Sequence, residues 1–249
     1  SETVAWLKGN HQAALIDINS MEEIDRAPLF GTVNTYSENI IWENCQFNNS
    51  SCTFVGGTCT GVLAGSLTNN TFDDCQFNST RSITVAQGFH LSGTTTSPLP
   101  ATTVSSQGTT LINCTANDVQ QIGNLSIPVV ASSSTIPVAS GYALFYTKDL
   151  TLVNCVAQDT IANGPLTTAG SVVGIYVTDV FGIAPPVLGT AFTENLVFRD
   201  CVASRTLALN GGHAIGIGLL DIRALTNESI KGALLEDCTS IGNMSMAGS

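Results

Sequence analysis

LTLVNCVA, residues 150–157, is one of six segments of this chain that align without gaps on an Asx-Cys pair. The other five are IIWENCQF (40–47), NTFDDCQF (70–77), TTLINCTA (109–116), LVFRDCVA (196–203) and ALLEDCTS (233–240). Successive cysteines of these segments lie 30, 39, 41, 46 and 37 residues apart, so a fixed core alternates with loops of variable length. This variation argues against helical repeats of constant length and against propeller blades.

The residues before each Asx-Cys pair alternate between inward and outward positions, as a half-buried strand requires. In the quoted segment, Leu150 and Leu152 are expected to point inward, while Thr151 and Val153 point outward. The second inward position is large and apolar in every segment: Trp42, Phe72, Leu111, Leu152, Phe198 and Leu235. Each segment therefore begins with a predicted strand whose inward residues stack along one axis.

The position before each cysteine holds only Asn or Asp: Asn44, Asp74, Asn113, Asn154, Asp200 and Asp237. Asx tolerates a positive φ better than most other non-glycine residues, and its side chain can hydrogen-bond to nearby backbone groups. The column therefore predicts a tight bend at the end of each strand.

After the bend, the cysteine is expected to turn inward together with the residue two positions later. A free cysteine behaves as a small and readily buried hydrophobe, so these thiols are predicted to stack as a structural ladder. Its members are Cys45, Cys75, Cys114, Cys155, Cys201 and Cys238. Cys52 and Cys59 lie outside the ladder and form either a local disulfide in an oxidising compartment or two more buried thiols.

A second recurring piece, seen at 88–91, 141–146, 174–177 and 216–220, begins with glycine and predicts another strand in each repeat. Strands that end in tight bends, and whose equivalent residues stack from one repeat to the next, predict an all-β fold. The expected architecture is a right-handed single-stranded parallel β-helix of about six coils. A sandwich or barrel is the alternative, although neither explains the fixed Asx-Cys step. We assign residues 30–249 to the β-helix.

Residues 1–29 are expected to form an N-terminal cap over the open strand edges of the first coil. Ser20 and Glu23 have capping-box spacing there, which predicts a short helix. The last repeat runs to the C-terminus without a comparable cap. Either the chain was cut there, or a partner subunit covers that end and the protein is a homo-oligomer.

The charge balance limits the classes of partner. The formal net charge is −11, with eight Lys and Arg residues, so the chain repels phosphate backbones and anionic lipid surfaces. No apolar run reaches the roughly 20 residues that a membrane-spanning helix needs. We therefore expect neither nucleic-acid binding nor membrane insertion.

Three long insertions, at 92–108, 117–140 and 178–194, are predicted to be loops on the rigid core, where recognition usually lies. The third is unusually apolar, and it either folds back over a flank of the coil or contacts a ligand or partner. Its candidate contact residues are Phe181, Ile183, Pro185, Pro186 and Phe192.

These repeats resemble those of the pectin-lyase-like β-helix superfamily, and particularly its Cys-bearing repeat proteins in giant DNA viruses and chlamydia-like bacteria. The resemblance covers roughly residues 30 to 243. Pectate lyases of that superfamily carry clustered Asp residues for calcium and an Arg base, whereas the arginines here are scattered. Polygalacturonase-like hydrolases carry Asn-Thr-Asp and Arg-x-Lys motifs, which are absent here. The resemblance thus implies the fold more than any activity, because this fold hosts enzymes, adhesins and inert spikes alike.

The weak catalytic candidates are Asp73 and Asp74, the one Asp-Asp pair, and His213 beside two glycines. Asp74 belongs to the bend column, which indicates a structural role, and a lone His in a turn is more often turn material than a base. Asp200 and Asp237 share a column, so their side chains either splay apart in solvent or recruit a hard cation such as Ca²⁺. We expect no metal and no cofactor.

Two functions follow from these observations. The first is a non-catalytic structural or adhesive β-helix on a virion or extracellular surface, which contacts glycans or host and virion proteins through its loops. The second is a carbohydrate-active enzyme, a polysaccharide lyase or glycoside hydrolase, whose site lies on one flank of the coil. The second requires two or more carboxylates, or Asp with Arg or Lys, to converge in one groove.

Overall fold

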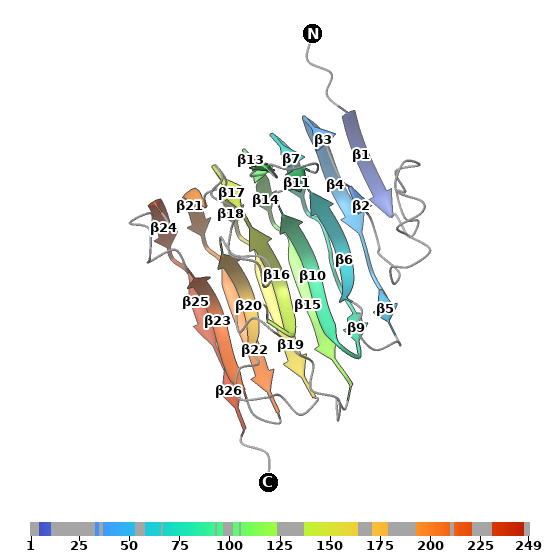
Figure 1. The fold of residues 1–249 in the computed structure, drawn as a ribbon, viewed down its shortest axis with the longest axis vertical. Coiled ribbons are helices and arrows are strands. Elements are labelled where there is room, and N and C mark those ends of the chain that lie inside the picture. The colour runs from blue at the N-terminus through green and yellow to red at the C-terminus, as the bar shows by residue number, and fades with distance from the viewer. Residues whose placement is uncertain are drawn as a thin grey trace.

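The computed structural model describes residues 5–10, 33–34, 37–52, 58–65, 67–92, 94–96, 102–104, 106–123, 137–163, 171–178, 193–209, 212–220 and 231–246. All regular structure in these ranges is β, arranged in three large parallel sheets and one small antiparallel pair (Figure 1). The predicted all-β class and the parallel pairing of the repeats are confirmed. The capping-box residues Ser20 and Glu23 lie outside the described residues.

The first sheet contains the strands that precede the Asx-Cys bends. Its members are β1 (Ala5–Asn10), β4 (Ile40–Gln46), β8 (Thr71–Asp73), β14 (Thr110–Ile112), β18 (Thr151–Val153), β21 (Glu194–Arg199) and β24 (Lys231–Glu236). Four shorter strands complete the sheet: β3 (Ser37–Glu38), β7 (Leu67–Thr68), β13 (Ser106–Gln107) and β17 (Thr147–Lys148).

The second sheet contains the strands of the glycine-led segments: β2 (Val33–Asn34), β6 (Thr58–Gly65), β10 (Val85–Ser92), β16 (Ala139–Phe145), β20 (Ser171–Thr178) and β23 (His213–Leu220). The third contains the strands beyond the Asx-Cys bends: β5 (Ser51–Cys52), β9 (Thr80–Ser82), β15 (Thr115–Gln121), β19 (Val156–Ala162), β22 (Val202–Ala208), β25 (Thr239–Ile241) and β26 (Met244–Ser245).

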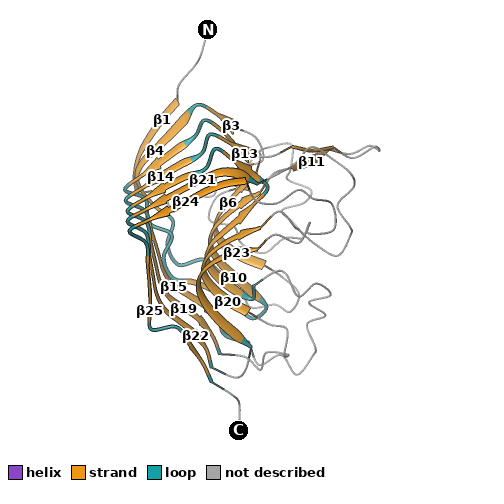
Figure 2. Ribbon diagram, turned by 90° about the vertical axis from the view of Figure 1, so that its left-hand side faces the viewer, coloured by secondary structure: helices purple, strands orange, loops and turns teal. Residues whose placement is uncertain are grey.

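The chain visits the three large sheets in turn, so each sheet collects equivalent strands from successive passages of the chain; the first sheet takes two strands from a passage, such as β13 and β14. For example, β10 of the second sheet precedes β14 of the first and β15 of the third, and the chain then returns to the second sheet as β16. Figure 2 shows the three sheets curled around a common interior, with the bends stacked along one edge. We call one such passage a coil. The arrangement is compatible with a parallel β-helix.

The coils stack in the register that the sequence alignment predicts. Leu111 pairs with Phe72 on one side and with Leu152 on the other, and Leu152 pairs in turn with Phe198. The inward positions from Trp42 to Phe198 are buried, whereas Leu235 on the last strand of the sheet is 44% exposed. Stacking on both sides therefore buries each inward residue, as the sequence predicts.

Aromatic rings fill the interior of the first coils. Trp42 and Phe72 stack with centroids 5.7 Å apart and an interplanar angle of 7°. Phe47 and Phe77 stack similarly, at 5.8 Å and 18°. Parallel register alone brings equivalent residues about 4.8 Å apart, so offset ring stacking needs little adjustment of the backbone.

The predicted bend is confirmed, because every residue of the Asx column has a positive φ, between 51° and 53°. Two further columns, five residues before and five residues after the first, have the same conformation. The earlier column is Asn39, Asn69, Gly108, Asp149, Asn195 and Gly232. The later column is Asn49, Ser79, Asp118, Asp159, Arg205 and Gly242. Within the described residues, each of the six repeats therefore has left-handed bends at two positions besides the predicted one, at five-residue intervals.

Glycines of the second sheet lie against alanines of the third. A Cβ atom added at Gly141 would lie 2.7 Å from the Gly174 carbonyl oxygen and 2.8 Å from the Ala157 Cβ. At Gly174 the corresponding distances, to the Gly216 oxygen and the Ala203 Cβ, are 2.7 and 2.9 Å. Only glycine leaves room for this approach, which explains the glycine that begins each of these segments.

We expect Gly174→Ala to lower the free energy of unfolding by about 1–3 kcal/mol, because it overpacks the contact with Ala203. Gly218→Ala is the matched control on the neighbouring strand, since its added Cβ meets no atom closer than 3.4 Å. Urea denaturation of both variants measures the difference. Equal stabilities of the two variants would contradict the packing argument.

The positive φ of Asn154, 52°, predicts how substitutions at this bend affect stability. Asn154→Val should cost about 1–2 kcal/mol, because a Cβ-branched residue is strained in the left-handed region. Asn154→Gly should cost less, since glycine adopts this conformation freely. Thermal unfolding of the pair tests the order, and a more stable Val variant would show that the bend is not maintained by backbone conformation.

Candidate functional site

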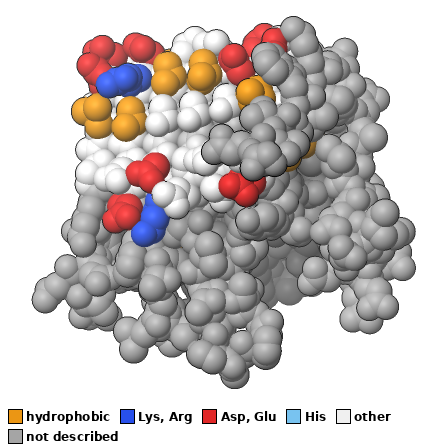
Figure 3. Space-filling view, turned by 90° about the horizontal axis from the view of Figure 1, so that it is seen from above, with side chains coloured by type: hydrophobic (Ala, Val, Ile, Leu, Met, Phe, Trp, Pro, Cys, Tyr) orange, Lys and Arg blue, Asp and Glu red, His pale blue; other side chains and the backbone are white. Residues whose placement is uncertain are grey.

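Equivalent outward residues of neighbouring coils form rows across the first sheet. Figure 3 shows acidic and basic side chains near one another on one face of the molecule. Asp73 lies on β8, and its Oδ1 accepts a long 3.5 Å hydrogen bond from the Asn113 amide nitrogen. Asp74 is the next residue and is the bend itself. Asn113 Oδ1 accepts a 2.9 Å hydrogen bond from Asn154 Nδ2. Amide groups of neighbouring coils are therefore the observed partners in these rows.

Ion pairs join neighbouring coils along the third bend column. Asp118 accepts hydrogen bonds from Arg81, at 2.7 Å, and from the Ser79 hydroxyl, at 3.1 Å. Arg205 pairs with Asp159 in the same way. Asp118 and Asp159 stand at adjacent register positions, each with its own arginine. Because they are partly exposed, such pairs contribute at most about 1 kcal/mol each, but they neutralise these carboxylates.

The first bend column is connected similarly. Asp149 accepts hydrogen bonds from Gln107 Nε2 at 3.2 Å and from Asn195 Nδ2 at 2.9 Å. Lys148 Nζ lies 3.0 Å from Glu194 Oε1 on the next coil. All four basic residues whose side chains the described ranges place, Arg81, Lys148, Arg199 and Arg205, thus pair with a carboxylate of a neighbouring coil.

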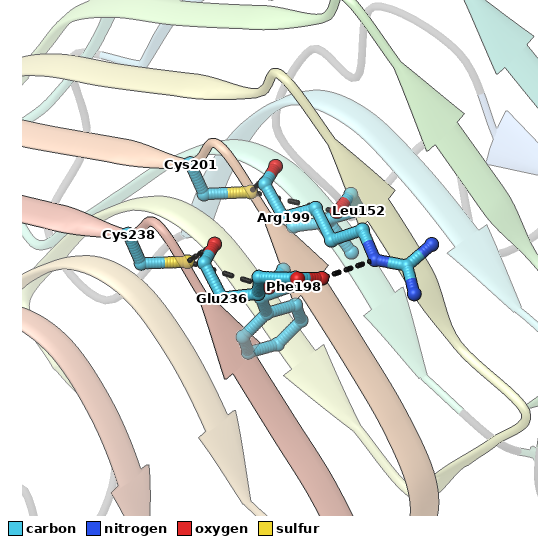
Figure 4. A network of polar contacts seen from close by, with 6 residues as sticks. All are labelled: Leu152, Phe198, Arg199, Cys201, Glu236 and Cys238. Atoms are coloured by element: carbon cyan, nitrogen blue, oxygen red, sulfur yellow. Dashed lines mark hydrogen bonds and ion pairs between the residues drawn. The ribbon is translucent and has the colours of Figure 1, made fainter.

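Asp200 and Asp237, the pair considered for Ca²⁺, occupy bends of consecutive coils, and both are exposed. The Asp200 backbone nitrogen donates a 3.1 Å hydrogen bond to the Glu236 carbonyl oxygen. Between the same coils, Arg199 Nε lies 2.7 Å from Glu236 Oε2 (Figure 4). Within the described ranges, no group of three or more His, Cys, Asp or Glu side chains is placed to hold a metal ion.

The cysteine column forms a regular internal ladder. Five of its thiols, from Cys45 to Cys201, are buried, and Cys238 on the last coil is half-buried. Each Sγ from Cys75 onward lies 3.4–3.6 Å from a carbonyl oxygen of the preceding coil. Figure 4 shows two of these contacts, Cys201 to Leu152 and Cys238 to Phe198. Weak thiol hydrogen bonds to backbone therefore accompany the packing of the ladder.

Burial keeps the five thiols from Cys45 to Cys201 out of contact with solvent and substrate, so they are poorly placed to act as nucleophiles. Burial raises the pKa of the Cys114 thiol, whereas hydrogen bonds with Cys114 lower the pKa values of Cys75 and Cys155, so it is the lack of access rather than the pKa that argues against nucleophilic chemistry here. A nucleophilic cysteine needs a lowered pKa and access to substrate. Cys59 is likewise buried, while the side chain of Cys52 lies outside the described residues. The two alternatives for these cysteines, a local disulfide or two more buried thiols, therefore stay predictions.

His213 and His90 occupy very different environments. His213, the weak catalytic candidate, begins β23 and is exposed. His90 lies on β10 and is 5% exposed, on the face of the second sheet opposite the aromatic core. Its Nδ1 lies 2.6 Å from Gln87 Oε1, and its ring centroid lies 5.1 Å from that of Phe145. Because an amide oxygen only accepts hydrogen bonds, Nδ1 carries the proton.

His90 belongs to the side of the second sheet that carries a separate apolar cluster. Its members are Ala143, Phe145, Tyr146, Val173 and Tyr176. Burial lowers the pKa of His90 to about 4, so the imidazole is neutral at physiological pH. A base with so low a pKa is poorly matched to neutral chemistry, which favours a packing role. The repeat pattern of the sequence did not predict that His90 is buried.

The insertions are only partly described. In the first, β11 (Thr94–Thr96) and β12 (Thr102–Val104) form an antiparallel hairpin that stands out from the coil (Figure 2). The second begins later than predicted, because β15 continues to Gln121. The candidate contact residues of the third, Phe181, Ile183, Pro185, Pro186 and Phe192, lie outside the described residues. Their role as contact residues therefore stays a prediction.

Comparisons with protein-family models, with curated proteins and with solved structures found no match for this chain. A search of the described residues found no helix long and apolar enough to cross a membrane.

The environment of His90 predicts a pH dependence of folding. Its folded pKa, about 4, lies below the ordinary value of 6.5, so its neutral form stabilises the fold. This contribution is complete above pH 6.5 and is lost as the pH falls toward 4. Loss of this contribution between pH 6.5 and pH 4 should lower the free energy of unfolding by roughly 3 kcal/mol.

Urea denaturation between pH 7 and pH 4 tests this prediction. His90→Phe should lose less stability than the native chain as the pH falls, because it has no imidazole to protonate. Phe145→Leu is the matched control, since it disturbs the same cluster and keeps the imidazole. An unchanged pH slope in His90→Phe would show that other groups cause the dependence.

Proposed function

We propose that this chain is a non-catalytic structural or adhesive protein displayed on a virion or extracellular surface. We further propose that it is a right-handed parallel β-helix of about six coils, over residues 30–249, with an N-terminal cap over residues 1–29. The in-register stacking of the Asx-Cys segments and the resemblance of the repeats support membership of the pectin-lyase-like superfamily. Its loops are proposed to contact glycans or host and virion proteins.

The observation that carries the non-catalytic proposal is the pairing of charges between coils. Among the described residues, Arg81, Arg199 and Arg205 all pair with carboxylates one coil away. Asp73 and Asp149 accept hydrogen bonds from amide groups of neighbouring coils. These contacts distribute the ionic groups along rows, whereas a lyase or hydrolase needs them to converge on one substrate atom.

Rigidity of the core supports a display role. The sheets pair through backbone hydrogen bonds between coils, and the same bonds continue through the bends. For example, Asn113 and Val156 nitrogens donate to the Val153 and Cys114 carbonyl oxygens at 3.0 and 2.9 Å. A projecting hairpin such as β11–β12 is then held on a stiff support, as recognition loops usually are.

Two measurements on the full chain test this function. We expect retention on a glycan or surface-protein array, and no release of reducing ends or unsaturated products from acidic polysaccharides. Replacing residues 181–188 with a Gly-Ser segment of equal length should weaken retention about ten-fold if that loop supplies a hot-spot contact. Asp73→Asn with Asp74→Asn is the control and should leave retention unchanged.

Turnover of a polysaccharide that is abolished by Asp73→Asn, Asp74→Asn or His213→Ala would overturn the proposal in favour of a carbohydrate-active enzyme. Absence of retention on every glycan and protein tested would overturn the adhesive role. Retention that survives replacement of residues 181–188 would instead assign the contact to another part of the surface.

A further inference from the structure

The sequence contains eight acceptor sequences for N-linked oligosaccharides, Asn-x-Ser/Thr with x other than Pro. Attachment bonds the sugar to the amide Nδ2 of Asn and adds a bulky polar group, so the modified chain can fold only where that amide is exposed and makes no contact that the fold needs. The structure describes the Asn of six of these sequences: Asn48, Asn49, Asn69, Asn78, Asn113 and Asn243.

Asn48 and Asn78 are half-buried members of a row that joins three coils. Asn48 Oδ1 accepts a 3.2 Å hydrogen bond from the Asn78 backbone nitrogen, and Asn78 Oδ1 accepts one of 3.1 Å from the Asn117 nitrogen. Their Nδ2 atoms donate to glutamine side chains of their own coils at 3.4 and 3.3 Å. The hydroxyl residues of these two acceptor sequences, Ser50 and Thr80, are buried. A sugar on either Asn would therefore disrupt the row.

Asn113 and Asn243 also use their amides within the fold. Asn113 Oδ1 accepts a 2.9 Å hydrogen bond from Asn154 Nδ2, and Asn113 Nδ2 lies 3.5 Å from Asp73 Oδ1. Asn243 is half-buried, and its Nδ2 donates a 2.7 Å hydrogen bond to Ser240 Oγ. A sugar on Nδ2 would displace these partners.

Asn49 and Asn69 differ from the other four. Both are exposed and lie at bends, with φ of 63° and 52°, and in the described part of the chain neither side chain makes a hydrogen bond. The equivalent residue of the next coil is small in both cases, Ser79 after Asn49 and Gly108 after Asn69. Ser79 donates its hydroxyl to Asp118, one coil further on. The neighbouring coil therefore leaves room for a sugar at each position.

The hydroxyl residues of these two acceptor sequences also lie at the surface. Ser51 is exposed, and Thr71 is partly exposed on the outer face of β8. The middle residues, Ser50 and Asn70, are buried, as expected when successive residues of an extended chain alternate between faces. Both acceptor sequences thus present their Asn and their hydroxyl residue to solvent while they anchor the chain through the residue between.

We propose that Asn49 and Asn69 are N-glycosylation sites of this chain. The inference rests on the proposed extracellular display, because N-linked sugars are added to chains that are being exported. The donor is a lipid-linked oligosaccharide diphosphate. Nδ2 bonds to the anomeric carbon of the first sugar and loses one proton, and the lipid diphosphate leaves. The sugars stand at the first and third bend columns of the first coils.

Secretion of the full chain from a eukaryotic host tests these sites. In the secreted protein, Asn49 and Asn69 should carry sugars, and the other four described acceptor sequences should be bare. An amidase that releases N-linked glycans converts each modified Asn to Asp, so mass spectrometry of the peptides identifies every site separately.

Overlapping acceptor sequences supply a matched pair of variants. Ser51→Ala removes the acceptor sequence of Asn49 and keeps the one that begins one residue earlier, whereas Ser50→Ala does the reverse. Ser51→Ala should lose one of the two glycans, and Ser50→Ala should keep both. Thr71→Val should remove the glycan of Asn69, and Thr71→Ser should retain it, because Ser supplies the same hydroxyl.

A secreted chain that is bare at Asn49 or at Asn69 would exclude that site. Equal glycosylation of Ser51→Ala and Ser50→Ala, or sugars on Asn48 or Asn78, would overturn the selection of sites by the fold. If circular dichroism shows that Ser51→Ala misfolds, Asn49→Gln supplies the same comparison. Retention on the glycan or protein array is measured separately, so its absence would count against the adhesive role and not against the modification.

Discussion

In-register parallel stacking is the constraint on which the rest of this structure depends. Equivalent residues of successive coils lie about 4.8 Å apart, so every position along the chain mainly contacts its own counterparts. A left-handed residue in one coil therefore requires one at the same place in the next, and this produces three columns of positive φ. Behind the second column, a thiol fits the space and its sulfur reaches a carbonyl of the preceding coil. Glycine is required where the second sheet approaches alanines of the third.

The sequence was sufficient for the parts of the fold in which residue type is conserved between coils. The Asn/Asp column, the cysteine column and the inward column from Trp42 to Phe198 all lie as predicted. The two further bends were missed because their columns mix residue types. Ser79 and Arg205 share a column with Asn49 and Gly242. Neither Ser nor Arg favours positive φ, so stacking on neighbouring coils sets their conformation, and the five-residue offset from each Asx-Cys pair was the only signal.

The candidate site was harder to predict, for the same physical reason. Asp118 and Arg81 are 37 residues apart in sequence, and Arg205 and Asp159 are 46 apart. These ion pairs follow from the register between neighbouring coils. Because the loops differ in length, the register is not apparent from sequence separation and requires alignment of the repeats. The burial of His90 was even harder to predict, because His90 lies on the outer face of the second sheet, whereas the repeat pattern predicts only which residues lie on the inner face.

The same stacking also limits where chemistry or assembly can arise. Along the described flanks, Arg81, Lys148, Arg199 and Arg205 each pair with a carboxylate one coil away, so these ion pairs are distributed along the coils rather than concentrated in one groove. On the last described coil this pairing is one-sided, because β24 pairs with β21 alone among the described strands. Glu236 has Arg199 on its inner side, and Leu235 has Phe198, but their outer sides meet no described strand. Leu235, with a described neighbour on one side only, is 44% exposed, whereas Phe198 lies between two coils and is buried, so burial of an inward residue in this fold depends on stacking on both sides.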